Sequence, residues 1–153
     1  MHLVLLAFGS NLGNRHAALG EAWYTLGQTD RIATVRLSPF YETEPVGGLT
    51  EQPMYINAAG IIQTSLSPLE LLETLHKIEH NFGRIRAERW GARTLDIDIL
   101  LYENQIIELP TLTIPHVEML RRQFVLSPAK DIAGDWIHPL TQKTLYEHWR
   151  DES

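Results

Sequence analysis

The stretch RWGARTLDIDIL, residues 89–100, decides the fold that we expect for this chain. Its second half places Asp96 and Asp98 between apolar residues, the pattern of a strand with one buried face. The opposite face, which we expect to lie in the core, then holds Ile97, Ile99 and Leu101. Two carboxylates on one sheet face repel each other unless a cation lies between them, and such oxygen ligands suit Mg²⁺. The stretch therefore predicts a strand that carries a magnesium site.

Arginines gather immediately before this strand, at Arg84, Arg86, Arg89 and Arg93. Guanidinium groups bind phosphate oxygens in bidentate fashion, so arginines beside a magnesium site indicate a polyphosphate clamp. Taken singly, an Asp-x-Asp pair is common, and four arginines more often form a solvated face. The combination is more specific because the pair Trp90-Gly91 joins the two groups as a loop that can move.

Working outward, the flanking sequence alternates strand and helix patterns. Apolar or alternating runs predict strands at 3–8, 34–43, 55–64 and 95–102. Pro39 lies inside the second run and makes it an edge or bulged strand. A turn at 103–104 follows the last of these strands.

Helical spacing predicts two helices between these strands. The first follows a possible N-cap at Asn14 and ends at Gly27. The second begins at Ser67, where Glu70 completes a capping box, and ends at Gly83. Two loops, 44–53 and 84–92, separate helices from strands, and weaker signals place a short helix within 115–126 and a final one at 140–150.

This β-α-β-β-α-β order with a C-terminal extension is that of the α+β, ferredoxin-like class. We therefore expect an antiparallel four-stranded sheet with helices on one face, and the other face open for a ligand. The length of 153 residues favours a single catalytic domain, 1–153.

The composition narrows the class of protein. The net charge of −6 argues against general nucleic-acid binding, yet six of the ten arginines fall between Arg84 and Arg122, which suits a small anionic ligand. The absence of cysteine excludes disulfides and thiolate catalysis. The apolar run 3–8 is too short to span a membrane, so we expect a cytoplasmic protein with no membrane partner.

Further polar residues share faces of the predicted elements. Tyr55 and Asn57 lie two apart on one strand and could stack on a ring and read its edge, although an ordinary half-buried tyrosine is the simpler interpretation. His76 and Glu79 lie three apart on the second helix and share a face, which could equally be solvated.

A family resemblance rests on these residues. The segment 89–98, Arg-Trp-Gly-x-Arg-x-x-Asp-x-Asp, resembles the signature of the 6-hydroxymethyl-7,8-dihydropterin pyrophosphokinase family. In the same order, GSNLG at 9–13, YINAA at 55–59 and IPH at 114–116, followed by Arg122 and Phe124, are similar to its other landmarks. We interpret the glycine-containing turn at 9–13 as mainly structural and packed beneath the pterin pocket, because it fits no phosphate-loop pattern.

The resemblance implies the same fold and a defined activity. The family transfers pyrophosphate from MgATP to 6-hydroxymethyl-7,8-dihydropterin in folate biosynthesis, giving the pterin diphosphate and AMP. Asp96 and Asp98 would hold Mg²⁺, with two ions as the expected number. The implied catalytic residues are Arg84, Arg86, Arg93, Asp96 and Asp98.

The resemblance also implies two sets of binding residues. The pterin set is Thr43, Val46, Tyr55, Asn57, Trp90, Asp96 and Phe124. The ATP set is His76, Glu79, Arg86, Trp90, Arg93, Ile99, Thr113, His116 and Arg122. The chain departs from the family pattern at His76, where glutamine is more frequent, and at Thr111 and Val117, where some relatives carry arginine and tyrosine.

Two alternatives come from other classes of protein. An RNA-binding domain of the same element order would need basic surface and several aromatic residues on its sheet face, whereas the strand at 55–64 offers Tyr55 and then alanines. A ligand-sensing regulatory domain would not explain the Asp pair and usually accompanies a second domain. We therefore expect small-molecule partners, no nucleic acid, and a monomer.

Overall fold

The structure is a computed structural model that describes residues 1–11, 15–43, 55–90 and 95–152, with only the backbone described for 83–90 and 152. In chain order the elements are β1 (His2–Ser10), α1 (Arg15–Gln28), β2 (Ile32–Leu37), β3 (Tyr41–Thr43), β4 (Tyr55–Thr64), α2 (Pro68–Trp90), β5 (Leu95–Tyr102), β6 (Ile107–Leu109), β7 (Leu112–Ile114), the 3₁₀ helix η1 (Met119–Arg121), α3 (Gln123–Ala133) and α4 (Leu145–Glu152).

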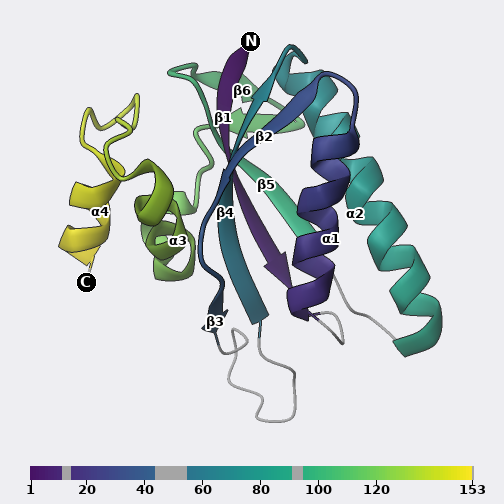
Figure 1. Ribbon diagram of the computed structural model, residues 1–153. Helices are drawn as coiled ribbons and strands as arrows, with labels where there is room; N and C mark the ends of the chain where they lie inside the picture. The colour runs from purple at the N-terminus through teal and green to yellow at the C-terminus, as the bar shows by residue number, and fades with distance from the viewer. Residues whose placement is uncertain (12–14, 44–54, 91–94, 153) are drawn as a thin grey trace.

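The described strands form an α+β architecture around one antiparallel sheet (Figure 1). Its order is β2-β4-β1-β5, and β3 also pairs with β4, beyond the end of β2. The central strand β1 is antiparallel to both β4 and β5. Strands β6 and β7 form a separate two-stranded sheet. The four predicted strands are thus confirmed, with Pro39 dividing the second into β2 and β3.

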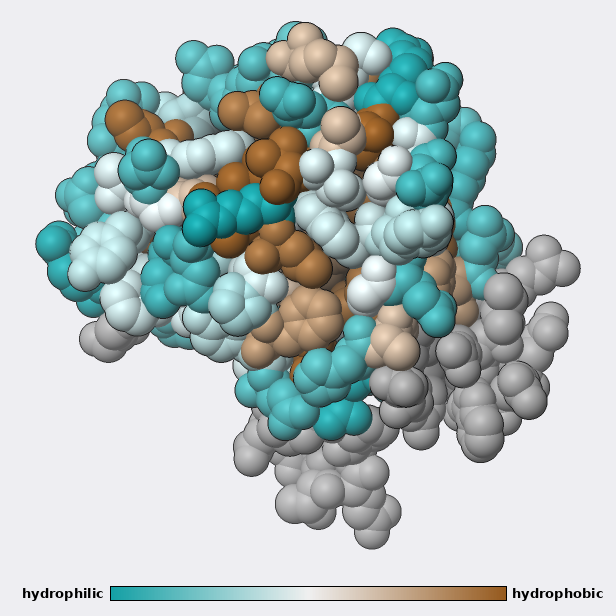
Figure 2. Space-filling model, viewed as in Figure 1, coloured by the Kyte–Doolittle hydropathy of each residue, from teal (hydrophilic) through white to brown (hydrophobic). Residues whose placement is uncertain are grey.

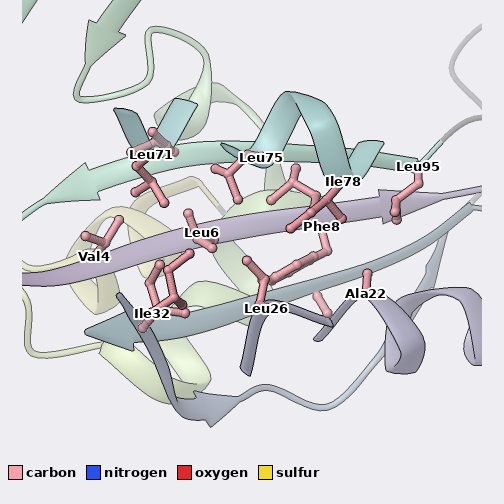
Figure 3. Close-up of a cluster of buried hydrophobic side chains, with 14 of the residues drawn as sticks. Val4, Leu6, Phe8, Ala22, Leu26, Ile32, Leu71, Leu75, Ile78 and Leu95 are labelled. Carbon is pink, nitrogen blue, oxygen red and sulfur yellow. The ribbon is translucent and has the colours of Figure 1, made fainter. Parts of the chain in front are cut away.

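The first hydrophobic core lies between the sheet and helices α1 and α2 (Figure 3). Alternate residues of β1, namely Val4, Leu6 and Phe8, point into it, as period-2 geometry requires. The helices contribute Ala18, Leu19, Ala22, Leu26, Leu71, Leu75 and Ile78.

The capping box at the start of α2 has formed as predicted. The Ser67 backbone N–H donates to Glu70 Oε1 at 2.9 Å, and the Glu70 N–H donates to Ser67 Oγ at 3.3 Å. These bonds satisfy two backbone donors at the N-terminal end of the helix. They fix where α2 begins beside the sheet.

A second core lies on the other face of the sheet, where α3 packs against β4 and α4 packs against α3 (Figure 1). It contains Leu5, Ala59, Ile61, Leu100, Leu101, Met119, Val125, Ala129, Ile132, Ala133 and Leu145 as buried members. The expectation of helices on one face only was therefore wrong. The apolar stripe of α3 needs a partner, and the apolar side chains on this part of the sheet provide it.

Two other expectations were wrong for local reasons. Helix α2 continues past Gly83 to Trp90, so 84–90 is not a loop. One glycine inside a helix costs only about 1 kcal/mol, and the residues that follow are mostly good helix formers. Leu101 lies with Leu100 in the second core, because the register shifts between Leu5 and Leu6 and leaves an extra residue on β5.

Toward the C-terminus the observed helices begin and end at other residues than predicted. The segment 115–126 holds η1 and only the start of α3, which runs on to Ala133. The final helix begins at Leu145 rather than at residue 140, after a turn at 138–142. Within the described residues, no helix is long and apolar enough to cross a membrane. Figure 2 shows a mostly polar surface with a hydrophobic band across its middle, where β2 runs in Figure 1.

Candidate active site

The Asp pair lies on β5 as the alternation predicts. Leu95, Ile97 and Ile99 are buried, and Asp96 and Asp98 are exposed on the opposite face of the strand. That face is shared with the second core, where α3 covers only part of the sheet. Both carboxylates therefore lie on the sheet face that the α1 and α2 helices do not cover.

The register of the sheet connects Asp96 to Asn57. Gly9 of β1 is the cross-strand partner of Asp96 on one side and of Asn57 on the other. Adjacent strands lie about 4.8 Å apart, so the two backbones are roughly 10 Å from each other. Between them Gly9 presents no side chain, which leaves the face open there. Sequence reasoning gave the turn at 9–13 a mainly structural role beneath the pterin pocket; the pairing register adds that Gly9 lies between Asp96 and Asn57.

Asn57 is the polar residue at the centre of this face. It is 7% exposed, and its Nδ2 donates to Thr43 Oγ1 at 2.6 Å. The hydrogen bond fixes which end of the carboxamide faces β3. Tyr55 is half-buried two residues earlier and pairs with Thr43 across the strands. The structure thus brings together three of the residues predicted for pterin binding.

Helix α3 begins beside this face with two further predicted residues. Arg122 is its N-cap residue, and the Arg122 guanidinium carbon lies 5.7 Å from the ring centroid of Phe124. This is cation–π geometry, and it holds the arginine against the aromatic ring. Phe124 is half-buried against the second core.

His116 approaches the Asp pair from the segment after β7. Its Nε2 lies 4.0 Å from Asp98 Oδ2, and its Nδ1 accepts from the Glu118 N–H at 3.1 Å. Because Nδ1 is an acceptor, the neutral ring carries its proton on Nε2, the atom that faces the carboxylate. His116 is thereby oriented toward Asp98.

Glu79 lies on the outer side of β5. Its Oε2 accepts from the Ile97 backbone N–H at 2.7 Å, and its Oε1 lies 4.0 Å from His76 Nε2. Burial raises the pKa of Glu79, and the Ile97 hydrogen bond acts in the opposite direction. The carboxylates of Asp96 and Asp98 add to the upward shift. Glu79 therefore interacts electrostatically with the Asp pair through the edge of the sheet.

A surface groove of about 740 Å³ runs along α2 and includes His76. Its lining is completed by Leu69, Leu72, Glu73, Lys77, His80, Asn81 and Thr111. Two aliphatic residues beside polar and charged groups suit a flat ring that carries hydrogen-bonding edges. The groove brings His76 next to Thr111, one of the positions where the chain departs from the family pattern.

Two further residues of the predicted ATP set, Ile99 and Thr113, differ in exposure. Ile99 is 3% exposed and belongs to the first core, so its side chain faces away from the Asp pair. Thr113 is exposed on β7, opposite Glu108.

Five predicted residues cannot be placed by their side chains. Val46 and Arg93 lie outside the described residues, and so does the whole of the predicted 44–53 loop. Arg84, Arg86 and Trp90 lie in α2, where the structure describes the backbone only. In the described part of the chain, no group of three or more His, Asp and Glu side chains is arranged to hold a metal ion.

The chain is similar to known proteins along most of its length. Residues 5–134 match the family model described as 7,8-dihydro-6-hydroxymethylpterin-pyrophosphokinase (HPPK). The chain is 46% identical over 137 residues to the 2-amino-4-hydroxy-6-hydroxymethyldihydropteridine pyrophosphokinase of Haemophilus influenzae, covering 90% of this chain and 85% of that protein. The protein of the same name from Bacillus subtilis is 43% identical over 131 residues, covering 86% of this chain and 78% of that one.

Solved structures share the fold. The crystal structure of Plasmodium falciparum HPPK-DHPS with pteroate has a TM-score of 0.75 to this chain at 15% sequence identity. The match covers 98% of this chain and 42% of that chain, so this chain spans less than half of the solved protein.

Proposed function

The chain belongs to the 7,8-dihydro-6-hydroxymethylpterin-pyrophosphokinase family, and on this premise we propose that its chemistry takes place on the sheet face that carries Asp96, Gly9 and Asn57. The protein is a pyrophosphokinase of folate biosynthesis. It transfers pyrophosphate from ATP to 6-hydroxymethyl-7,8-dihydropterin, giving the pterin diphosphate and AMP. The shared pairing of Asp96 and Asn57 with Gly9 is the observation that carries the assignment of the site, since it brings the metal and pterin residues together.

The pterin slot in this proposal lies over Gly9. Asn57 would read the edge of the ring with the carboxamide that Thr43 orients, and Tyr55 and Phe124 would supply aromatic contacts. A flat ring held by a few fixed polar groups between aromatic side chains is the usual architecture of such a site. The family resemblance adds Val46 and Trp90 to this slot.

The nucleotide would lie on the other side of Gly9, toward β5 and α2. The donor set fits Mg²⁺, because this ion is commonly held by one or two carboxylates together with substrate phosphates. Asp96 and Asp98 would be those carboxylates, with two ions expected. Mg²⁺ bound there would neutralise charge on the phosphate oxygens of ATP.

Protein groups around the Asp pair would orient the nucleotide. His116, with its Nε2 proton directed toward Asp98, is placed to donate to a phosphate oxygen when the phosphates bind there. Arg122 would add positive charge from the start of α3. The α2 groove with His76 would receive the base, while Glu79 supports β5 from behind through Ile97.

The remaining assignments follow from the resemblance. Arg84, Arg86 and Arg93 would neutralise the charge that develops as the β-phosphorus is attacked by the pterin hydroxyl oxygen and AMP leaves.

We also propose two broader assignments, one for the fold and one for the domain organisation. The strand order β2-β4-β1-β5 supports the ferredoxin-like βαββαβ description, with β3 and the C-terminal helices as additions. A single cytoplasmic, monomeric catalytic domain over 1–153 is our expectation from length and composition.

Calorimetry tests the proposed site. We expect a non-hydrolysable ATP analogue to bind in the presence of Mg²⁺ and much more weakly in its absence. A pterin substrate analogue should then bind to the complex of protein, Mg²⁺ and ATP analogue with a stoichiometry of one. Metal-independent nucleotide binding of equal affinity would contradict the role of the Asp pair. The Asn57→Ala and Asp98→Asn variants then assign each heat to its half of the site.

A further inference from the structure

Strand β3 is the weakest part of the framework around the pterin slot. It is only three residues long, and its ladder partners lie on β4 alone. Yet Thr43 on this strand accepts the hydrogen bond from Asn57 Nδ2. A three-residue edge strand makes few ladder hydrogen bonds, so contacts of its side chains with the rest of the protein contribute to its position.

That support comes from α3. The Tyr41 hydroxyl, on the residue directly opposite Asn57, donates a short hydrogen bond to Asp131 Oδ2. The other oxygen, Asp131 Oδ1, lies 2.7 Å from Lys130 Nζ. Both side chains of this ion pair are about one-fifth exposed, at 19% for Lys130 and 22% for Asp131.

The same cluster is fixed from α4. Lys130 Nζ lies 4.4 Å from the ring centroid of Trp149, and Trp149 Nε1 donates to Ser127 Oγ at 3.2 Å. The hydrogen bond to Asp131 raises the pKa of Tyr41, and the same carboxylate raises the pKa of Lys130. Tyr41 thus stays a neutral donor, and the carboxylate is held on both sides.

Helix geometry links this cluster to the slot. Phe124 and Asp131 are seven residues apart on α3, so they lie on one stripe of the helix, about 10 Å apart along its axis. One end of that stripe packs Phe124 against the second core on this face of the sheet, and the other end holds Tyr41 through Asp131. The stripe therefore sets the spacing between α3 and the β3–β4 pair.

We propose that Asp131 is a positioning residue for the pterin slot: through Tyr41 it fixes β3, and with it the Thr43–Asn57 pair, relative to Phe124. The inference rests on the proposed function, because it requires Asn57 and Phe124 to contact the pterin. Asp131 itself touches no substrate in this scheme. Binding groups have to be held within about 0.5 Å of the productive geometry, which a three-residue strand does not achieve alone.

The test uses Asp131→Ala and Tyr41→Phe, singly and together, in the full-length chain. We expect the dissociation constant for a pterin substrate analogue, measured by calorimetry, to rise about tenfold in each single variant. The double variant should bind the pterin analogue no more weakly than the weaker-binding single variant, because both substitutions remove the same Tyr41–Asp131 hydrogen bond. Affinity for an ATP analogue with Mg²⁺ should change by less than about twofold. Asp131→Asn keeps an acceptor and should fall between wild type and Asp131→Ala.

Ser67→Ala is the matched control. Ser67 caps α2, with Oγ accepting from the Glu70 N–H at 3.3 Å, and α2 packs on the opposite face of the sheet from α3. This variant should lower thermal stability and leave pterin affinity unchanged. An equal loss of pterin affinity in Ser67→Ala, or unchanged affinity in Tyr41→Phe, would overturn the inference.

Asn57→Ala separates this inference from the proposed function. If Asn57→Ala loses pterin binding while Tyr41→Phe and Asp131→Ala retain it, the slot stands and the positioning role of Asp131 is wrong. If Asn57→Ala also binds pterin normally, the proposed slot is wrong and the role of Asp131 falls with it.

Discussion

At the scale of the residue, Asp96 and Asp98 are the side chains whose chemistry can be tested most directly. Asp96→Asn and Asp98→Asn should each lower the rate of AMP formation by more than tenfold at saturating Mg²⁺, about 1.4 kcal/mol or more in barrier, because an amide holds a cation poorly. The fold should survive, since both residues are exposed. Glu103→Gln is the control: this exposed carboxylate follows β5 directly and contacts His2 instead. An Asp variant with more than a tenth of wild-type activity would contradict the metal role.

Asn57 gives the second prediction at this scale. Asn57→Ala should weaken pterin binding by about 1–3 kcal/mol, because polar atoms of the buried ring lose their partner. Nucleotide binding should stay nearly unchanged, since Asn57 lies one strand beyond Gly9 from Asp96. Separate titrations with each ligand measure the two affinities. Weaker nucleotide binding with intact pterin binding would reverse the assignment of the two halves.

Sequence reasoning reached these residues because each carries a local signal. The alternation around Asp96 and the spacing of Tyr55 and Asn57 place side chains on a face without knowledge of the partner strands. The position of Gly9 and the link between Tyr41 and Asp131 depend on register and on residues 90 apart in the chain. No local pattern encodes such contacts, which is why they were not predicted.

At the scale of the element, α1 packs on β4 where a glycine permits close approach. A Cβ atom on Gly60 would clash with the Trp23 ring and meet Phe8 Cε2 at 3.0 Å. Gly60→Ala should therefore destabilise the protein by about 1–3 kcal/mol in urea unfolding. Gly20→Ala on α1, where no atom lies within 4 Å of the added Cβ, should instead stabilise the protein by about 0.5–1 kcal/mol. If Gly60→Ala had wild-type stability, the Trp23 ring would be able to move aside without a loss of folding free energy.

The turn before α4 should respond to acid. His138 is 3% exposed, burial lowers its pKa, and its Nδ1 accepts from the Leu140 N–H at 3.2 Å. His148, with a ring centroid 5.9 Å away, adds to that shift. Between the lowered folded pKa and the unfolded value of 6.5, the unfolded chain binds more protons. Stability is therefore lost as the pH falls below about 6.5.

His138→Asn keeps an acceptor for Leu140 and removes the titrating group. The acid slope of the unfolding free energy should shrink in this variant, as measured by urea titrations between pH 7 and pH 5. His80→Asn, exposed on α2, is the matched control and should retain the wild-type slope. An unchanged slope in His138→Asn would assign the acid sensitivity to other groups.

Helix α2 shows how far element boundaries follow from sequence. Its start was predicted because the capping box is a local motif, and the structure forms both of its hydrogen bonds. Its end was not, because a single glycine is a weak stop signal when helix-forming residues follow. The placement of α3 was also missed, since its partner surface is built from β1, β4 and β5 together.

At the scale of the whole molecule, two cores share one sheet. Side chains from opposite faces of β1, such as Leu5 and Leu6, belong to different cores. Neither core can lose its packing without exposing a face of the same strands. We therefore expect a single cooperative unfolding transition.

This expectation is tested with one large-to-small substitution in the first core and one on α3, the helix that contributes to the second core. Leu6→Ala in the first and Leu126→Ala on α3 should each cost about 2–5 kcal/mol, because both side chains are fully buried. Circular dichroism and tryptophan fluorescence should report the same urea midpoint in both variants. Separate midpoints for the two probes in Leu126→Ala would show that the C-terminal helices unfold independently.

The hydrogen bond from the Ile97 N–H to Glu79 also bears on how the protein behaves when it is concentrated. In the described part of the sheet, β5 is an edge strand, and an edge with unpaired donors invites a strand from another molecule. Here that donor is occupied by a side chain of α2, and α2 packs along β5. A neighbouring copy that tried to extend the sheet would have to displace a charged group and a helix. The contact that supports the strand of the Asp pair thus also protects the protein from edge-to-edge aggregation.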